Sequence, residues 1–199
     1  HMETPLESLW ALDLDPVRAH RLTRDPSISV TQFTISDDSR WVGFRGVSSN
    51  RFERTRGGTI MGSQSNLYSE LYLLEAATGQ IEQLTRAVEI NKSGPYFSPD
   101  GRWVAFIGPR DMTRYTRGLT QRVYLRAVDE RGGDFSRLGD SFDGNVGIDF
   151  WSVDGNTIYF NQGIRTTEQL MALDVGSNTV RQLSDQDAQL NVSQDEDSG

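Results

Sequence analysis

The chain has 199 residues, a formal net charge of -8 and no cysteine. The absence of cysteine excludes disulfides, thiolate metal sites and a cysteine nucleophile. The acidic balance argues against nucleic acid as a partner, because phosphate binding needs a basic face. No apolar run of about 18 residues is present, so we expect no membrane partner. No signal-peptide pattern is visible either, which favours a cytoplasmic location but leaves the compartment open.

The first predicted element follows His1-Met2, which resemble a scar left by cloning. Residues 9–13 read LWALD and residues 21–23 read RLT, with a polar turn between them. Short apolar runs on either side of a polar turn predict a pair of antiparallel strands. We call this pattern the Leu-Thr phrase. It returns as LYLLE to QLT at 71–85, as LMALD to QLS at 170–184, and as a longer copy at 123–139.

A second phrase, which we call the Ser-x-Asp phrase, alternates with the first. It reads ISDDSRWVGF at 35–44, FSPDGRWVAF at 97–106 and WSVDGNTIYF at 151–160. An apolar strand enters, an Asp-Gly type turn reverses the chain and a second apolar strand leaves, which predicts a β-hairpin. The aligned Asp38, Asp100 and Asp154 are predicted to bond backbone amides of their own turns, rather than to act as paired carboxylates or calcium ligands.

The alternation of the two phrases gives four strands per repeat, with a period of about fifty residues. Units of this kind must stack on neighbours to bury their apolar faces, and short runs of period two exclude a helix. We therefore predict an all-β fold, a partial β-propeller of four-stranded antiparallel blades, with about three full blades and part-blades at both ends. The predicted boundaries are the outer half of a blade at 3–27, full blades at 28–87, 88–141 and 142–186, and the start of a further blade or a frayed tail at 187–199.

The two phrases together resemble the TolB-like, WD40-like repeats of β-propellers. Within that class, Arg51-Phe52-Glu53-Arg54 followed by NLYSELY at 66–72 is similar to the dipeptidyl aminopeptidase and acylaminoacyl-peptidase branch of the prolyl oligopeptidase family. In that family the N-terminal propeller caps a separate α/β-hydrolase domain. The resemblance implies that the parent is a serine peptidase, and that this propeller caps and gates its active site and helps to bind the peptide substrate.

The chain itself lacks the catalytic residues of such a peptidase. It contains no Gly-x-Ser-x-Gly nucleophile elbow, and His20 is the only histidine besides His1, so no Ser-His-Asp triad can form. We expect this chain to have no enzymatic activity of its own and to bind no cofactor and no metal. The alternative function is a TolB-like protein-binding propeller without an enzyme partner domain.

Arginines gather in the two long segments between the second and third predicted strands of a blade. Because the guanidinium fork matches a carboxylate, these arginines are candidates for binding a peptide carboxylate or an acidic partner surface. The candidate residues are Arg51, Arg54, Arg56, Arg110, Arg114 and Arg117, and Arg45 and Arg122 belong to the same two predicted loops. The other interpretation is a pair of solvated loops with local ion pairs to Glu53 and Asp111. Residues 57–65 have no strand pattern and are predicted to form a mobile loop.

The remaining distinctive side chains are interpreted as structural. The four tryptophans, Trp10, Trp41, Trp103 and Trp151, occur at repeat positions and are predicted to pack between blades. His20 is interpreted as an exposed strand residue, neither ligand nor base. Because a partial propeller leaves apolar blade faces and strand edges uncovered, we also expect self-association with a second copy.

Overall fold

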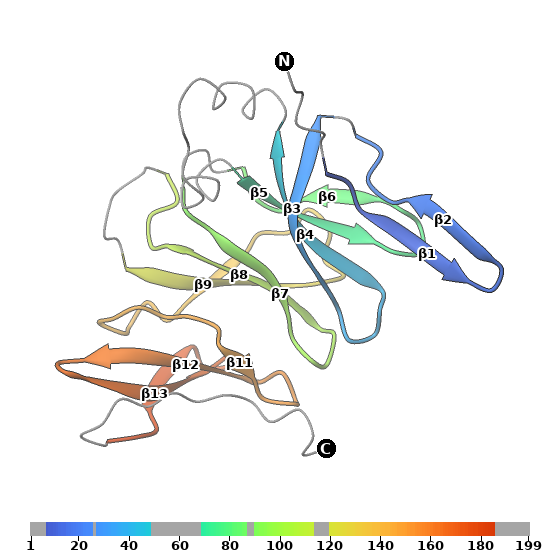
Figure 1. Ribbon diagram of the computed structural model, residues 1–199. Helices are drawn as coiled ribbons and strands as arrows, with labels where there is room; N and C mark the ends of the chain where they lie inside the picture. The colour runs from blue at the N-terminus through green and yellow to red at the C-terminus, as the bar shows by residue number, and fades with distance from the viewer. Residues whose placement is uncertain (1–6, 26, 49–68, 87–89, 114–119, 186–199) are drawn as a thin grey trace. The chain divides into compact units, whose positions relative to one another are not determined.

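The computed structural model describes residues 7–25, 27–48, 69–86, 90–113 and 120–185. All regular secondary structure in these residues is β-strand, arranged in one two-stranded and three four-stranded sheets (Figure 1). The chain divides into two compact units, His1–Tyr96 and Phe97–Gly199. The described part contains no helix that is long and apolar enough to cross a membrane.

The two-stranded sheet consists of β1 (Trp10–Leu14) and β2 (Val17–Arg21), which run antiparallel. Leu9, directly before β1, belongs to a buried apolar cluster with residues of the following sheet, among them Val30, Phe44 and Tyr72. Side chains alternate between the two faces of a strand. Leu9 therefore points toward that sheet, and Trp10 points to the opposite face.

The first four-stranded sheet runs in the order β3 (Ile28–Ile35), β4 (Trp41–Ser48), β5 (Ser69–Glu75) and β6 (Ile81–Gln83). Each strand pairs antiparallel with the next one along the chain. Phe44 in β4 stands opposite Tyr72 in β5, and their rings stack with centroids 5.0 Å apart. Both rings belong to the apolar cluster that Leu9 joins.

The other two four-stranded sheets repeat this meander. One comprises β7 (Ser93–Phe97), β8 (Trp103–Pro109), β9 (Gln121–Ala127) and β10 (Ser136–Leu138). The other comprises β11 (Phe150–Trp151), β12 (Thr157–Ile164), β13 (Thr167–Asp174) and β14 (Thr179–Gln182). Successive four-stranded meanders are the blades of a β-propeller. The predicted fold class, an all-β partial β-propeller, is confirmed.

The Ser-x-Asp phrase forms the turn between the first two strands of each blade. In the first blade, the Ser36 hydroxyl donates to Asp38 Oδ1 at 2.6 Å, and the same oxygen accepts the amide of Arg40 at 3.0 Å. Ser36 Oγ also accepts the amide of Trp41 at 3.0 Å, which closes the turn. The same bonds recur in the other two blades, around Asp100 and Asp154. The predicted role of these aspartates in their own turns is confirmed.

The Leu-Thr phrase ties the fourth strand of a blade to the start of the third. The hydroxyl of Thr85, just after β6, accepts the amide of Leu71 in β5 at 3.0 Å. Ser184 does the same for Leu170 at 2.9 Å, and Thr23 for Leu9 at 2.9 Å. In these three copies the hydroxyl satisfies an amide that lies beyond the end of the outer strand, where the ladder of backbone hydrogen bonds has stopped.

The four tryptophans differ in burial, and their packing between blades stays a prediction where they are buried. Trp41 and Trp151 are buried, at 2% and 6% exposed, and Trp103 is half-buried. Trp10 is 61% exposed, so its predicted packing is wrong in this structure. The physical reason is its position on the face of the two-stranded sheet that turns away from the blade β3–β6, where no described residue covers it.

Candidate functional site

Three arginines and one aspartate meet at one end of the blade β7–β10. Arg110 follows β8 directly, Arg122 lies at the start of β9, Arg137 lies in β10 and Asp140 follows β10. The antiparallel register brings them together, because the start of β9 pairs with the end of β8 on one side and with the end of β10 on the other. We call these four residues the Asp140 cluster.

Arg137 holds the carboxylate of Asp140 most closely. Its Nε lies 2.9 Å from both carboxylate oxygens, and its Nη2 lies 2.7 Å from Oδ2. The Nε atoms of Arg122 and Arg110 lie 3.5 and 3.7 Å from Oδ1. Three guanidinium groups with three positive charges thus face one negative carboxylate, and the cluster has two positive charges in excess.

Arg122 forms the buried base of the cluster, with a side chain only 1% exposed. Its Nη1 donates to the carbonyls of Gln121 and Gly144, at 2.7 and 2.6 Å, and its Nη2 donates to the carbonyl of Phe142 at 2.7 Å. Burial lowers the pKa of Arg122, and the charge of Arg110 lowers it further. The carbonyls compensate a guanidinium that would otherwise lose its hydration without replacement.

The hydrogen bonds between Arg137 and Asp140 keep both of these side chains charged. The bond from Arg137 lowers the pKa of Asp140, and the bond to Asp140 raises the pKa of Arg137. Both groups are therefore ionised at neutral pH. The nearby Tyr124 hydroxyl donates to the carbonyl of Pro109 at 2.7 Å, and burial raises the pKa of this phenol.

Of the six arginines predicted as ligands, Arg110 alone lies in the described residues, and it belongs to the Asp140 cluster. The others, Arg51, Arg54, Arg56, Arg114 and Arg117, lie outside the described residues, as does the predicted mobile loop at 57–65. The ligand role of all six stays a prediction.

The assignment of Arg45 and Arg122 to loops is wrong. Arg45 lies in β4 and Arg122 in β9, and they are 7% and 1% exposed. Backbone carbonyls stabilise both buried guanidiniums; Arg45 Nη2, for example, donates to the carbonyl of Lys92 at 2.9 Å.

Sequence reasoning also missed Arg137 and Asp140. The signal was the altered Leu-Thr phrase, in which Gly139 replaces the hydroxyl residue and the following loop turns back over the strand ends.

A second buried charged group lies in the first unit. Glu70 at the start of β5 lies 3.2 Å from the ammonium group of Lys92, and it also accepts the hydroxyl of Thr85 at 2.6 Å. Glu70, Arg122 and Gln169 occupy the same place in successive blades, one residue before the amide that the Leu-Thr phrase contacts. The fold thus varies the chemistry at one repeated position.

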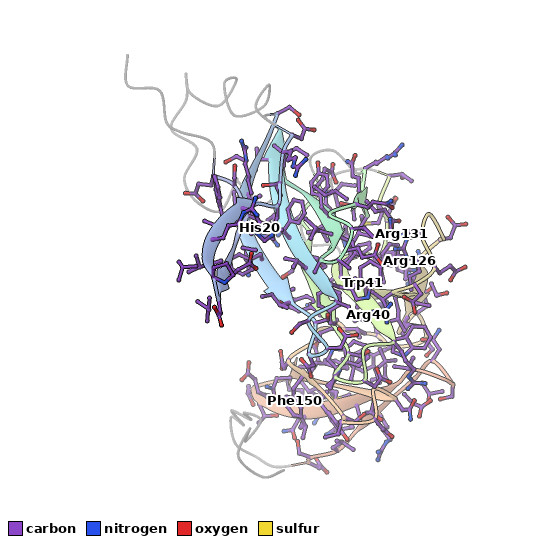
Figure 2. All side chains as sticks on the ribbon, turned by 90° about the vertical axis from the view of Figure 1, so that its right-hand side faces the viewer. His20, Arg40, Trp41, Arg126, Arg131 and Phe150 are labelled. Carbon is purple, nitrogen blue, oxygen red and sulfur yellow. The ribbon has the colours of Figure 1, made fainter. Side chains whose placement is uncertain are left out.

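His20 is an exposed strand residue, as the sequence predicts. His20 lies in β2 on the two-stranded sheet (Figure 2) with 48% of its side chain exposed, and its Nδ1 is 3.5 Å from Asp13 Oδ2. Arg40 and Trp41 are adjacent at a hairpin turn, and the Arg40 guanidinium lies 5.7 Å from the ring centroid of Trp41. Within the described ranges, no group of three or more histidines, aspartates or glutamates could hold a metal ion.

Comparison with known proteins identifies the fold. No family model matches the chain, and no curated protein sequence matches it. Among solved structures, a putative TolB from Agrobacterium tumefaciens matches 90% of this chain at 22% identity, with a TM-score of 0.54. Oligogalacturonate lyase from Vibrio parahaemolyticus matches 88% at 15% identity and a TM-score of 0.62. A putative dipeptidyl aminopeptidase IV from Bacteroides ovatus matches 85% at 11% identity and a TM-score of 0.57.

These similarities define the class of protein. The chain is a propeller module, similar in fold to TolB and to the propellers of peptidases. It spans 55%, 47% and 31% of the TolB, lyase and aminopeptidase chains, respectively.

Proposed function

We propose that this chain is the non-catalytic propeller of a serine peptidase, and that it caps the active site of an α/β-hydrolase domain and helps to bind peptide substrate. The fold similarity to the dipeptidyl aminopeptidase supports the peptidase part of this proposal. The non-catalytic part rests on the sequence, which has no Gly-x-Ser-x-Gly elbow and no set of residues for a Ser-His-Asp triad. The single observation that carries it furthest is the Asp140 cluster, which places an excess of positive charge at the strand ends of one blade in a chain of net charge -8.

In this role the propeller acts by exclusion and by positioning. A closed ring of blades over an active site admits an extended peptide and keeps out folded proteins. Exposed arginines at the strand ends would then hold the charged end or an acidic side chain of the peptide. Arg51, Arg54, Arg56, Arg114 and Arg117 are candidates for the same role together with Arg110. The partners under this proposal are a peptide substrate and the hydrolase domain.

The experiment that tests this function is to read the coding sequence beyond the codon for Gly199. Further propeller repeats followed by Gly-x-Ser-x-Gly, with an aspartate and a histidine after it, are the expected result. The encoded full-length protein should then cleave short peptides and leave folded proteins intact. A coding sequence that ends after a few more blades would contradict the peptidase proposal.

A second candidate function is a TolB-like protein-binding propeller with no enzyme partner. The TolB similarity, which extends over 90% of this chain, favours it. Under this alternative the arginines would contact an acidic protein surface. The same coding sequence separates the two functions, since only the peptidase requires a hydrolase domain on the same chain.

A further inference from the structure

The guanidinium group of Arg110 is the most exposed of the three in the Asp140 cluster. Its side chain is 53% exposed, and its one charged contact among the described residues is the 3.7 Å approach of Nε to Asp140. No described residue accepts a hydrogen bond from its Nη atoms. Two Nη groups of a planar fork are thus available to a ligand from solvent.

The rest of the cluster is held in place. Arg137 donates from Nε and Nη2 to Asp140, and from Nη1 to the backbone carbonyl of Arg110 at 2.7 Å. Arg122 is fixed below by carbonyls. The neighbouring carboxylate of Asp111 accepts the amide and the hydroxyl of Thr113, at 2.9 and 2.5 Å. The positive charges of Arg137 and Arg122 are therefore in place before any ligand arrives, so only the Arg110 side chain has to be ordered on binding.

The geometry points to a site for the carboxylate group of a peptide on Arg110, supported by Arg137 and the buried Arg122; this inference rests on the proposed function and names the substrate feature that the propeller holds. Asp140 shows that the cluster accepts a carboxylate, because its two oxygens already receive bonds from Arg137. The four residues of the cluster have two positive charges in excess, and one remains when the neighbouring Asp111 is counted, which favours a second carboxylate beside Asp140. A fork of two parallel N–H donors suits the two oxygens of a carboxylate.

The same chemistry is present at a peptide C-terminus and on a glutamate or aspartate side chain. Three acetylated alanine-rich peptides separate these sources: one with a free C-terminal carboxylate, one with a C-terminal amide, and one amide with a central glutamate. We expect the free-acid peptide to bind at least about tenfold more tightly than the neutral amide by calorimetry, and binding to weaken as salt increases. Tight binding of the glutamate peptide instead assigns the site to an acidic side chain.

The matched variants are Arg110→Gln, Arg110→Lys and Arg181→Gln. Arg181 lies in the outer strand β14, is exposed and takes no part in the ion pairs of the cluster, so its loss removes one surface charge and leaves these contacts unchanged. We expect Arg110→Gln to abolish the difference between acid and amide peptides. Arg110→Lys should keep only part of it, because an ammonium group lacks the fork. Arg181→Gln should bind like the unaltered chain.

Several results would overturn the inference. These are equal binding of acidic and neutral peptides, unaltered binding by Arg110→Gln, or binding of inorganic phosphate with no binding of either acidic peptide. Because Arg110 is exposed and makes one long ion contact, its variants should keep the thermal unfolding midpoint of the parent, which verifies that they fold. The coding sequence tests the peptidase proposal separately, so failure of this inference and failure of that proposal can be distinguished.

Discussion

The ammonium group of Lys92 lies 3.2 Å from a carboxylate oxygen of Glu70, and the two side chains are 0% and 10% exposed. Lys92 is the only lysine of the chain. Its ammonium group also donates to the carbonyl of Ile90 at 3.2 Å, and its own carbonyl accepts Arg45 Nη2 at 2.9 Å. A side chain that composition alone would assign to the surface is thus the centre of a buried charged group.

Removing one partner of this pair should destabilise the first unit strongly. Lys92→Met leaves the Glu70 carboxylate buried without its counter-charge, and we expect the free energy of unfolding to fall by about 3–5 kcal/mol. The double variant Lys92→Met with Glu70→Gln removes both charges, keeps an acceptor for Thr85, and should recover most of the loss. Urea unfolding curves measure both. If Lys92→Met alone is as stable as the parent, the Glu70 carboxylate does not depend on Lys92 as its counter-charge.

The burial of Lys92 can also be measured by chemistry. An amine-reactive reagent should modify the chain terminus of the native protein and leave Lys92 unmodified, because the ammonium group is shielded from solvent. In denaturing urea, Lys92 should react fully. Peptide mass spectrometry gives the modified fraction at each position. Rapid modification of Lys92 in the native protein would mean that the segment before β7 opens far more easily than its contacts indicate.

The turn aspartates should make stability depend on acid pH. The Ser152 hydroxyl, and then the amide of Asn156, lower the pKa of Asp154 from its ordinary 3.8. A carboxyl group with a lowered folded-state pKa contributes stability that is complete above its ordinary value and is lost as the pH falls through the lower one. The thermal midpoint should therefore stay flat above about pH 5 and fall below about pH 4.

A carbon-detected NMR titration of the carboxyl groups tests the cause. Ser152→Ala removes the hydroxyl donor and should move the pKa of Asp154 up toward 3.8. Asp174, whose pKa is lowered by the amide and hydroxyl of Ser177 in another turn, is the internal control and should titrate unchanged. No movement at Asp154 would mean that the amide and the side chain of Asn156 set its pKa without the hydroxyl.

The fold could be predicted because its signals are local and repeated. The Ser-x-Asp turn satisfies its own hydrogen bonds within five residues, from Ser36 to Trp41, so the pattern is visible in the sequence. The Leu-Thr phrase is nearly as local, since Thr85 contacts Leu71 across one hairpin. In the first copy, at 35–44, Ser39 takes the place of the glycine. It adopts a positive φ of 58°, as Gly101 and Gly155 do in the other two copies.

The candidate site could be predicted only in part, because it depends on long-range pairing. Arg110 and Asp140 are thirty residues apart, and the strand register that joins them is not a sequence pattern. Arg45 directly follows the apolar run that ends at Phe44, and Arg122 directly precedes the run that begins at Val123, so the sequence pattern places both in loops. The acceptors that stabilise these buried guanidiniums are backbone carbonyls, which every residue type has, so no sequence motif could indicate them.

A glycine in the third blade should resist substitution. A Cβ on Gly155 would lie 2.6 Å from the carboxyl carbon of Asp100, and its φ is +64°. Gly155→Ala should lower the free energy of unfolding by about 1–2 kcal/mol from the left-handed backbone alone, and by more from the contact. Gly163→Ala is the matched control, since a Cβ there meets nothing within 4 Å. Equal thermal midpoints for the two variants would contradict this account of the turn.

The uncovered face of the two-stranded sheet should cause self-association. Trp10, Leu12, Leu14 and Val17 are 61%, 59%, 78% and 77% exposed. The register places Leu14 opposite Val17, so these side chains share one face. A contiguous apolar face of this kind favours association. Since a second copy carries the same face, we expect the average mass by light scattering to rise with concentration.

A charge in the middle of this face should prevent the association. Leu12→Lys would place an ammonium group where the two copies meet, and we expect the midpoint concentration of association to rise at least about tenfold because that charge would lose its hydration. Val153→Lys is the matched control, because Val153 is a single apolar side chain, 82% exposed, in a hairpin turn of the third blade. It should associate like the parent. If the parent stays monomeric at high concentration, or if both variants lose association equally, the apolar face of β1 and β2 is not the contact between copies.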